Sequence, residues 1–114
     1  MAVIFMKIAI CDDDNSFLQN VKFLINKIYS NPDKLSIYEY ESGEQFLLQF
    51  KPQFFDVIIL DIEMCGITGL EVAEEIRKID KSVILAFLTS HQEFATLGYE
   101  VNAFRYILKA TPHN

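Results

Sequence analysis

Residues 56–71 read DVIILDIEMCGITGLE, and this stretch indicates the fold of the whole chain. Its first part, 56–60, is a short apolar and β-branched run, which favours a buried strand over a helix. Thr68 and Glu71 have the spacing of a capping box, in which two side chains bond the backbone of a helix's first turn. A strand, a loop that starts at Asp61 and a helix therefore follow one another, as in one unit of a parallel α/β sheet.

The same alternation of apolar runs and amphipathic stretches continues on both sides of this unit. We expect five strands, at residues 3–11, 35–40, 56–60, 83–88 and 104–108. Four helices are expected, one over 17–28 that stops at Asn31-Pro32-Asp33, and three that begin at the capping boxes 42–45, 68–71 and 90–93. The pattern predicts one α/β domain with a parallel sheet, and the alternating polarity of residues 35–40 predicts an edge strand.

Polar side chains follow four of the predicted strands, where the strands end. They are Asp12, Asp13 and Asp14, then Asp61, then Thr89 and Ser90, and finally Lys109. In a parallel α/β sheet, binding sites form outside the carboxyl ends of the strands. Carboxylates that lie close together repel one another, and oxygen ligands without His or Cys suit Mg²⁺. A carboxylate beside Mg²⁺ can attack phosphorus to form an acyl phosphate, while Lys109 and Thr89 contact phosphoryl oxygens.

Four motifs carry a family resemblance that covers nearly the whole chain. They are IAICDDD at residues 8–14, DIEMCGITGL at 61–70, FLTS at 87–90 and YILK at 106–109. In this order they resemble the signature motifs of two-component response regulator receiver domains. The resemblance implies a flavodoxin-like (CheY-like), doubly wound sheet with strand order 2-1-3-4-5. The sequence around residues 90–91, 98–103 and 106–109 is most similar to that of receivers from regulators with a LytTR-type DNA-binding domain.

The resemblance also implies a role for each acidic site residue. Asp61 would accept a phosphoryl group from a sensor histidine kinase. The side chains of Asp13 and Asp61, with the backbone carbonyl of Glu63, would bind Mg²⁺, and Asp12 would hold the metal through water. The domain would itself catalyse phosphoryl transfer and dephosphorylation, and would otherwise be a signalling module rather than an enzyme.

The predicted switch lies at the last two strands. Thr89 would close on the phosphoryl group, Lys109 would neutralise its charge, and Tyr106 would change rotamer with Thr89. Ala110 follows the lysine where the family usually has a proline with a cis peptide bond, and a cis bond before alanine would cost about 3 kcal/mol. Cys65 likewise replaces a usual proline. We expect Lys109 to be held less firmly, and the loop after Asp61 to be less rigid, than in the family.

The chain ends soon after the last predicted strand. Only residues 110–114 follow, although a sheet covered on both faces would need one more helix there. We therefore expect a receiver domain over residues 1–114 that is truncated before its final helix, with the output domain absent. Apolar surface beside the first and fifth strands would be partly exposed, which is unusual for a monomer and predicts a homodimer or an exchange of elements.

Composition limits the other functions. The formal net charge of −6 argues against direct nucleic-acid binding by this segment, which needs clustered Lys and Arg. The apolar start is interrupted by Lys7 and is too short for a membrane span or a signal peptide, so a cytoplasmic protein is expected. Cys11 and Cys65 lack the CxxC spacing of zinc or redox sites and should be free thiols.

Two other functions remain open at this point. Residues 12–16, DDDNS, also fit the D-x-D-x-S nucleophile motif of haloacid-dehalogenase phosphatases, with Asp12 as nucleophile and Asp14 as acid or base. The chain could instead be a receiver-like binding module that is never phosphorylated. Taken singly, the acidic run has a simpler explanation too, because carboxylates are favourable at the start of a helix.

Overall fold

The computed structural model describes residues 5–29, 31–89 and 105–108. Its elements in chain order are β1 Met6–Cys11, α1 Asn15–Ile28, the 3-10 turn η1 Pro32–Lys34, β2 Leu35–Tyr40, α2 Gly43–Gln49, β3 Val57–Asp61, α3 Gly69–Ile79, β4 Ile84–Thr89 and β5 Arg105–Leu108. The helix expected at the capping box 90–93 lies outside the described residues. So do residues 109–114.

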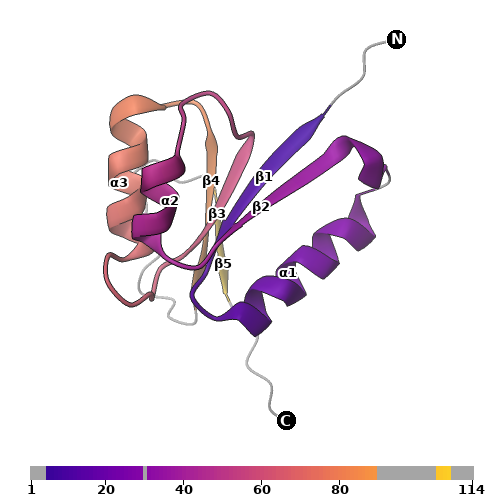
Figure 1. Cartoon of the computed structure of the whole chain (residues 1–114), viewed down its shortest axis with the longest axis horizontal. Helices are drawn as coiled ribbons and strands as arrows, with labels where there is room; N and C mark the ends of the chain where they lie inside the picture. The colour runs from indigo at the N-terminus through magenta and orange to yellow at the C-terminus, as the bar shows by residue number, and fades with distance from the viewer. Residues whose placement is uncertain (1–4, 30, 90–104, 109–114) are drawn as a thin grey trace.

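All five strands join one parallel sheet in the order β2-β1-β3-β4-β5. Helices α2 and α3 lie on one side of this sheet and α1 lies on the other, as Figure 1 shows. The predicted α/β class, the strand order and the edge position of β2 are therefore confirmed. A parallel crossover needs a helix between strands, which is why the apolar runs alternate with amphipathic stretches.

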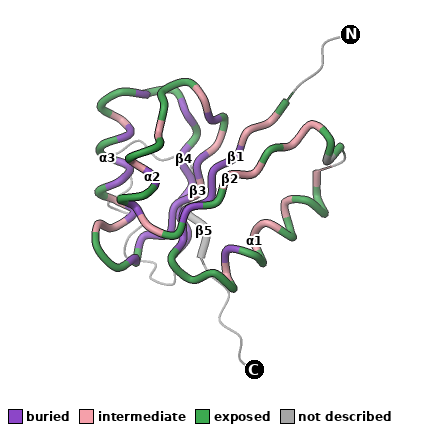
Figure 2. Tube along the Cα trace, in the orientation of Figure 1, coloured by how far each residue is buried: buried purple, intermediate pink, exposed green. Residues whose placement is uncertain are grey.

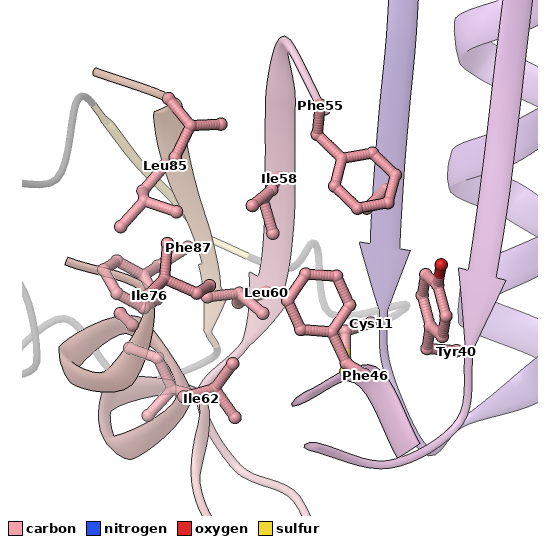
Figure 3. Close-up of a cluster of buried hydrophobic side chains, with 14 of the residues drawn as sticks. Cys11, Tyr40, Phe46, Phe55, Ile58, Leu60, Ile62, Ile76, Leu85 and Phe87 are labelled. Atoms are coloured by element: carbon pink, nitrogen blue, oxygen red, sulfur yellow. The ribbon is translucent and has the colours of Figure 1, made fainter. Parts of the chain in front are cut away.

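The main core lies between the sheet and the pair of helices α2 and α3. Side chains from all three pack there, with Phe46 of α2, Leu60 of β3 and Phe87 of β4 fully buried (Figure 3). The ring of Phe46 meets that of Tyr40 edge to face, with centroids 5.0 Å apart. Burial of these large apolar groups is the main force that holds both helices on the sheet.

The opposite face of the sheet has a smaller core. Ile8 and Ile10 of β1 pack with Leu18, which is the buried residue of α1. Most of α1 is exposed or half-buried, whereas the centre of the sheet is buried (Figure 2). Helix α1 is thus held by a narrower apolar contact than α2 and α3.

Some predicted strand boundaries were wrong by a few residues. β1 begins at Met6 rather than at residue 3, and Phe5 lies outside it. β3 and β4 each begin and end one residue later than expected. Before β4, the N–H of Val83 donates to the carboxylate of Asp80 at 3.1 Å and so is used in a turn rather than in the sheet. The shift at β3 makes Asp61 a strand residue, opposite Leu88.

The predicted capping boxes differ in their geometry. At α3 the box is complete, because the Thr68 hydroxyl accepts from Glu71 N–H and the Glu71 carboxylate accepts from Thr68 N–H. At α2 the hydroxyl of Ser42 caps Gln45 N–H, but the Gln45 side chain bonds the N–H of Glu41 instead of that of Ser42. The box at Ser42 is therefore only half formed, although the start of α2 was predicted correctly.

Candidate phosphorylation and metal site

Three carboxylates come together at the carboxyl edge of the sheet. Asp12 follows β1, Asp61 ends β3, and Asp13 lies in the loop that leads into α1. One oxygen from each side chain lies within 4.8 Å of the others. Asp12 and Asp61 are only 0% and 1% exposed, while Asp13 is exposed. Two of the carboxylates thus lie inside the domain, and the third borders solvent.

The sheet itself brings the two buried carboxylates to the same edge. The N–H of Asp12 donates to the carbonyl of Tyr40 at 3.0 Å, one residue beyond the end of β1. The N–H of Ile62 donates to the carbonyl of Leu88 at 3.1 Å, one residue beyond β3. Parallel pairing therefore continues just past both strands and fixes the backbone that carries the acidic side chains.

Backbone N–H groups orient all three carboxylates. The donors are Asp14 N–H to Asp12 Oδ1 at 2.9 Å, Cys65 N–H to Asp13 Oδ2 at 2.9 Å and Glu63 N–H to Asp61 Oδ1 at 3.4 Å. These bonds hold three like charges close together, and like charges repel one another. A cation among the three oxygens relieves this repulsion, and an all-oxygen donor set fits Mg²⁺.

Glycine is required where α3 begins, directly behind Asp61. A Cβ atom on Gly69 would lie 2.9 Å from the carbonyl carbon of Asp61 and 3.0 Å from the Cα of Ile62. Real side chains do not approach a backbone so closely. The N–H of Gly69 also donates to the carbonyl of Ile62 at 3.0 Å. The start of α3 therefore packs directly against the peptide that carries the buried carboxylate.

Comparison with known proteins assigns this arrangement to a family. The family model described as the response regulator receiver domain matches residues 8–114. The chain belongs to the response regulator receiver domain family. The predicted resemblance is confirmed. The family match therefore favours a receiver over the alternative of a haloacid-dehalogenase phosphatase.

Individual relatives agree with this family. The chain is 35% identical over 104 residues to the sensory transduction protein LytR of Staphylococcus epidermidis, covering 91% of this chain and 40% of the relative. It is 39% identical over 71 residues to the sensory transduction protein LytT of Oceanobacillus iheyensis, covering 60% of this chain and 29% of that relative. The chain thus spans less than half the length of these relatives, which are LytTR-type regulators.

One similar solved structure was determined in complex with Mg²⁺. The response regulator TrrA of Thermotoga maritima, solved in complex with Mg²⁺-BeF, is 30% identical with a TM-score of 0.76. The match covers 95% of this chain and 90% of that chain. The likeness therefore includes nearly the whole receiver.

The predicted switch residues are only partly described. Thr89 ends β4, and its backbone pairs with that of Leu108 in β5. Tyr106 lies in β5 opposite Phe87. The side chains of Thr89 and Tyr106 are outside the description, as are Lys109 and Ala110 altogether, so their roles stay predictions.

The third aspartate of the acidic run caps a helix in this receiver. The carboxylate of Asp14 caps α1, because its Oδ1 accepts from Ser16 N–H at 3.1 Å and from Phe17 N–H at 3.2 Å. Helix capping, the simpler explanation of the run, is therefore right for this aspartate. Asp12 and Asp13 instead face Asp61.

Cys11 lies directly under the acidic residues as an inert buried thiol. Burial, and then the negative charges of Asp12 and Asp61, raise the pKa of its thiol to about 12. Its Sγ lies 3.4 Å from the carbonyl of Ser42 and 3.7 Å from Sδ of Met64. The thiol stays protonated at neutral pH and fills the core beneath the site. Both cysteines are free, as predicted, and Cys65 is the exposed one.

Sequence reasoning missed one residue that shapes the loop after Asp61. Glu44, in the first turn of α2, accepts the N–H of Ile67 on its Oε2 at 3.1 Å. The bond joins positions 23 residues apart. Glu44 lies inside the predicted capping box 42–45, and no periodicity or motif links it to the loop. Only the packing of α2 beside α3 brings these groups together.

Proposed function

We propose that Asp61 is the residue of this receiver that accepts a phosphoryl group, taken from a phosphohistidine of a sensor histidine kinase. The observation that carries the proposal is the convergence of Asp12, Asp13 and Asp61, whose oxygens lie within 4.8 Å of one another. A buried aspartate with two acidic neighbours is costly to keep in a fold unless it binds a cation or reacts.

The transfer needs one bond to form and one to break. An oxygen of Asp61 attacks phosphorus, the P–N bond to the kinase imidazole breaks, and the imidazole nitrogen keeps the electron pair. The product on this chain is an acyl phosphate. The N–H of Glu63 helps to orient the Asp61 carboxylate. The contact between Gly69 and the Asp61 peptide fixes the backbone from which the carboxylate projects.

The same residues would hold the metal. Asp13 and Asp61 side chains and the Glu63 carbonyl would bind Mg²⁺, and Asp12 would reach it through water. Bound Mg²⁺ would neutralise charge on the attacking carboxylate and on the phosphoryl oxygens. In our proposal Lys109 neutralises the remaining phosphoryl charge and Thr89 closes on the phosphoryl group. Tyr106 changes rotamer together with Thr89.

The whole protein would pass the signal on to transcription. LytR of Staphylococcus aureus is a transcriptional regulatory protein, and it is 30% identical over 104 residues, which are 41% of its length. We propose that the full-length protein carries a DNA-binding output domain whose activity depends on the phosphorylation of Asp61. The receiver itself, with its net charge of −6, would not contact nucleic acid.

Phosphorylation by a small donor tests the acceptor directly. Incubation with acetyl phosphate and Mg²⁺ should add one phosphoryl group to the wild type, measured by intact mass. Asp61→Asn should show no adduct, and a chelator should prevent the adduct on the wild type. Asp33→Asn changes an exposed aspartate in η1, away from the site, and is the matched control that should behave as wild type.

Other outcomes would reject the assignment. An adduct of equal size on Asp61→Asn would place the acceptor elsewhere. A wild type that takes no phosphoryl group, from acetyl phosphate or from a kinase, would favour the binding module that is never phosphorylated.

A further inference from the structure

The exposed aspartate of the acidic site is held by the loop after β3. The N–H of Cys65 donates to Oδ2 of Asp13 at 2.9 Å, and the two residues are 52 positions apart in the chain. Asp13 is exposed, unlike Asp12 and Asp61. An exposed side chain normally samples several rotamers, and repulsion by two nearby carboxylates would turn Asp13 away from them. The Cys65 N–H opposes both tendencies.

The backbone of the loop is itself fixed on the far side of Cys65. Gly66 has φ +81°, a conformation that favours glycine and turns the chain sharply. The next N–H, from Ile67, donates to Oε2 of Glu44 at 3.1 Å. The carboxylate of Glu44 therefore holds the loop from α2, at a point that does not depend on Asp13. A donor on such a fixed backbone can orient a mobile side chain rather than follow it.

The active group at this position is the peptide N–H and not the thiol. Cys65 is exposed, and its side chain takes no part in the bond to Asp13. Any residue except proline can supply the N–H. A carboxylate has two oxygens with about four acceptor sites, so Asp13 can accept this bond and bind a cation at the same time.

We propose that the Cys65 N–H is a positioning group, which holds Asp13 toward Asp12 and Asp61 before the metal arrives. The inference rests on the proposed binding of Mg²⁺ at these three carboxylates. It adds that part of the metal affinity comes from pre-organisation of Asp13 by the loop that follows the phosphoacceptor. Residues that orient metal ligands typically change metal affinity by about 10-fold to 100-fold when lost.

The test compares two substitutions of Cys65 in the whole 114-residue chain. Cys65→Ala keeps the N–H and removes the thiol, so its Mg²⁺ dissociation constant should stay within about twofold of wild type. Cys65→Pro removes the N–H and should weaken Mg²⁺ binding by about tenfold. Isothermal titration calorimetry with MgCl₂ alone measures both, and circular dichroism checks the fold. Equal or tighter binding by Cys65→Pro would overturn the proposal, and so would an equal loss in Cys65→Ala.

A second measurement does not depend on how well the proline variant folds. In metal-free wild type, the Cys65 amide should exchange with solvent deuterium more slowly than in Asp13→Ala, by about tenfold. The Gly69 amide donates to the Ile62 carbonyl and should exchange at the same rate in both proteins. Equal exchange of the Cys65 amide in both proteins would show that the bond to Asp13 does not persist without metal, and would overturn the proposal.

The metal site and the positioning role of Cys65 can fail separately. Absence of Mg²⁺ binding by the wild type would reject the metal site and the inference together. Suppose that wild type and Cys65→Pro bind Mg²⁺ equally well and are both phosphorylated on Asp61. That result would reject only the positioning role of Cys65.

Discussion

Asp12, Asp61 and Asp80 are the buried acidic side chains among the described residues, and backbone N–H groups bond each of them. Asp12 and Asp61 face each other at the carboxyl edge of the sheet. Asp80 lies after α3, at the opposite end of the strands, where it accepts N–H groups from two loops. The same type of residue thus lies at the proposed phosphorylation site at one edge and binds backbone donors of two loops at the other. The difference comes from the neighbours, since Asp80 has backbone donors and no second carboxylate in its set of bonds.

Replacement of Asp80 should destabilise the domain in a pH-dependent way. Burial opposes ionisation of this carboxyl, but hydrogen bonds from Gln53, Ser82 and Val83 outweigh burial and hold its pKa below the ordinary value. A lowered folded-state pKa stabilises the fold above the unfolded pKa, which is about 3.9. This stability is lost as the pH falls through the folded-state pKa. Asp80→Asn should lower the free energy of unfolding by about 1–3 kcal/mol at pH 7.

Urea denaturation at several pH values measures this effect. The difference between wild type and Asp80→Asn should shrink as the pH falls below about 4. Asp33→Asn is the control, and should change stability by less than about 0.5 kcal/mol. A difference that is constant from neutral to acidic pH would contradict the role of the Asp80 charge.

Gly69→Ala should destabilise the domain by about 1–3 kcal/mol, because the added Cβ would collide with the Asp61 peptide. Alanine has the higher helix propensity, so propensity alone would predict the opposite sign. Glu74→Ala, at an exposed position of the same helix, is the matched control and should be near neutral. Urea unfolding of both variants decides between collision and propensity. A stabilised Gly69→Ala would refute the close approach.

At the scale of elements, hydrogen bonds at the ends of helices tie α2 and α3 to the loops of the site. Helix α3 begins at the capping box of Thr68 and Glu71, directly after the acidic loop. Helix α2 begins at Gly43, after its N-cap Ser42, and its Glu44 reaches across to that loop. The starts of both helices were predictable from local sequence, because a capping box lies within four residues. The bond from the loop before α3 to Glu44 of α2 was not predictable, because it depends on how α2 and α3 pack.

Loss of the α3 cap should weaken the fold by a modest amount. Thr68→Ala removes the hydroxyl that accepts from Glu71 N–H, and should cost about 1 kcal/mol of unfolding free energy. Thr68→Ser keeps the hydroxyl and should recover most of that loss. Thermal unfolding followed by circular dichroism measures both, and an equal loss in the two variants would argue against the cap.

At the scale of the whole molecule, the two faces of the sheet differ in how well they are covered. Two helices bury the larger core on one face, whereas α1 alone covers part of the other face within the described residues. Helix α1 also exposes Phe23 at 65%, Leu24 at 53% and Ile28 at 80%. No helix in the described part of the chain is long and apolar enough to cross a bilayer.

The predicted homodimer stays a prediction, and the exposed side chains of α1 support it. We expect the chain of residues 1–114 to self-associate with increasing concentration through a second copy. The double variant Leu24→Glu/Ile28→Glu should reduce this association, because both side chains lie one turn apart on α1 and are exposed. Lys27→Glu on the same helix is a control for the added charge. Sedimentation velocity that shows only monomer for the wild type at high concentration would contradict the prediction.

The amino-acid sequence by itself determined the fold class and the three acidic residues of the candidate site. It also located the helices and strands, with most of their ends correct to within a few residues. It could do so because apolar runs of strand length alternate with amphipathic helices, and because parallel strands end at a common edge where Asp12, Asp13 and Asp61 follow. These are regularities of a few neighbouring residues. The tertiary structure alone decided that Glu44 and Asp13 bond the loop after Asp61, and that Gly69 lies against the Asp61 peptide. Each of these last contacts with the site joins groups from different elements, whose separation in space depends on packing and not on sequence spacing.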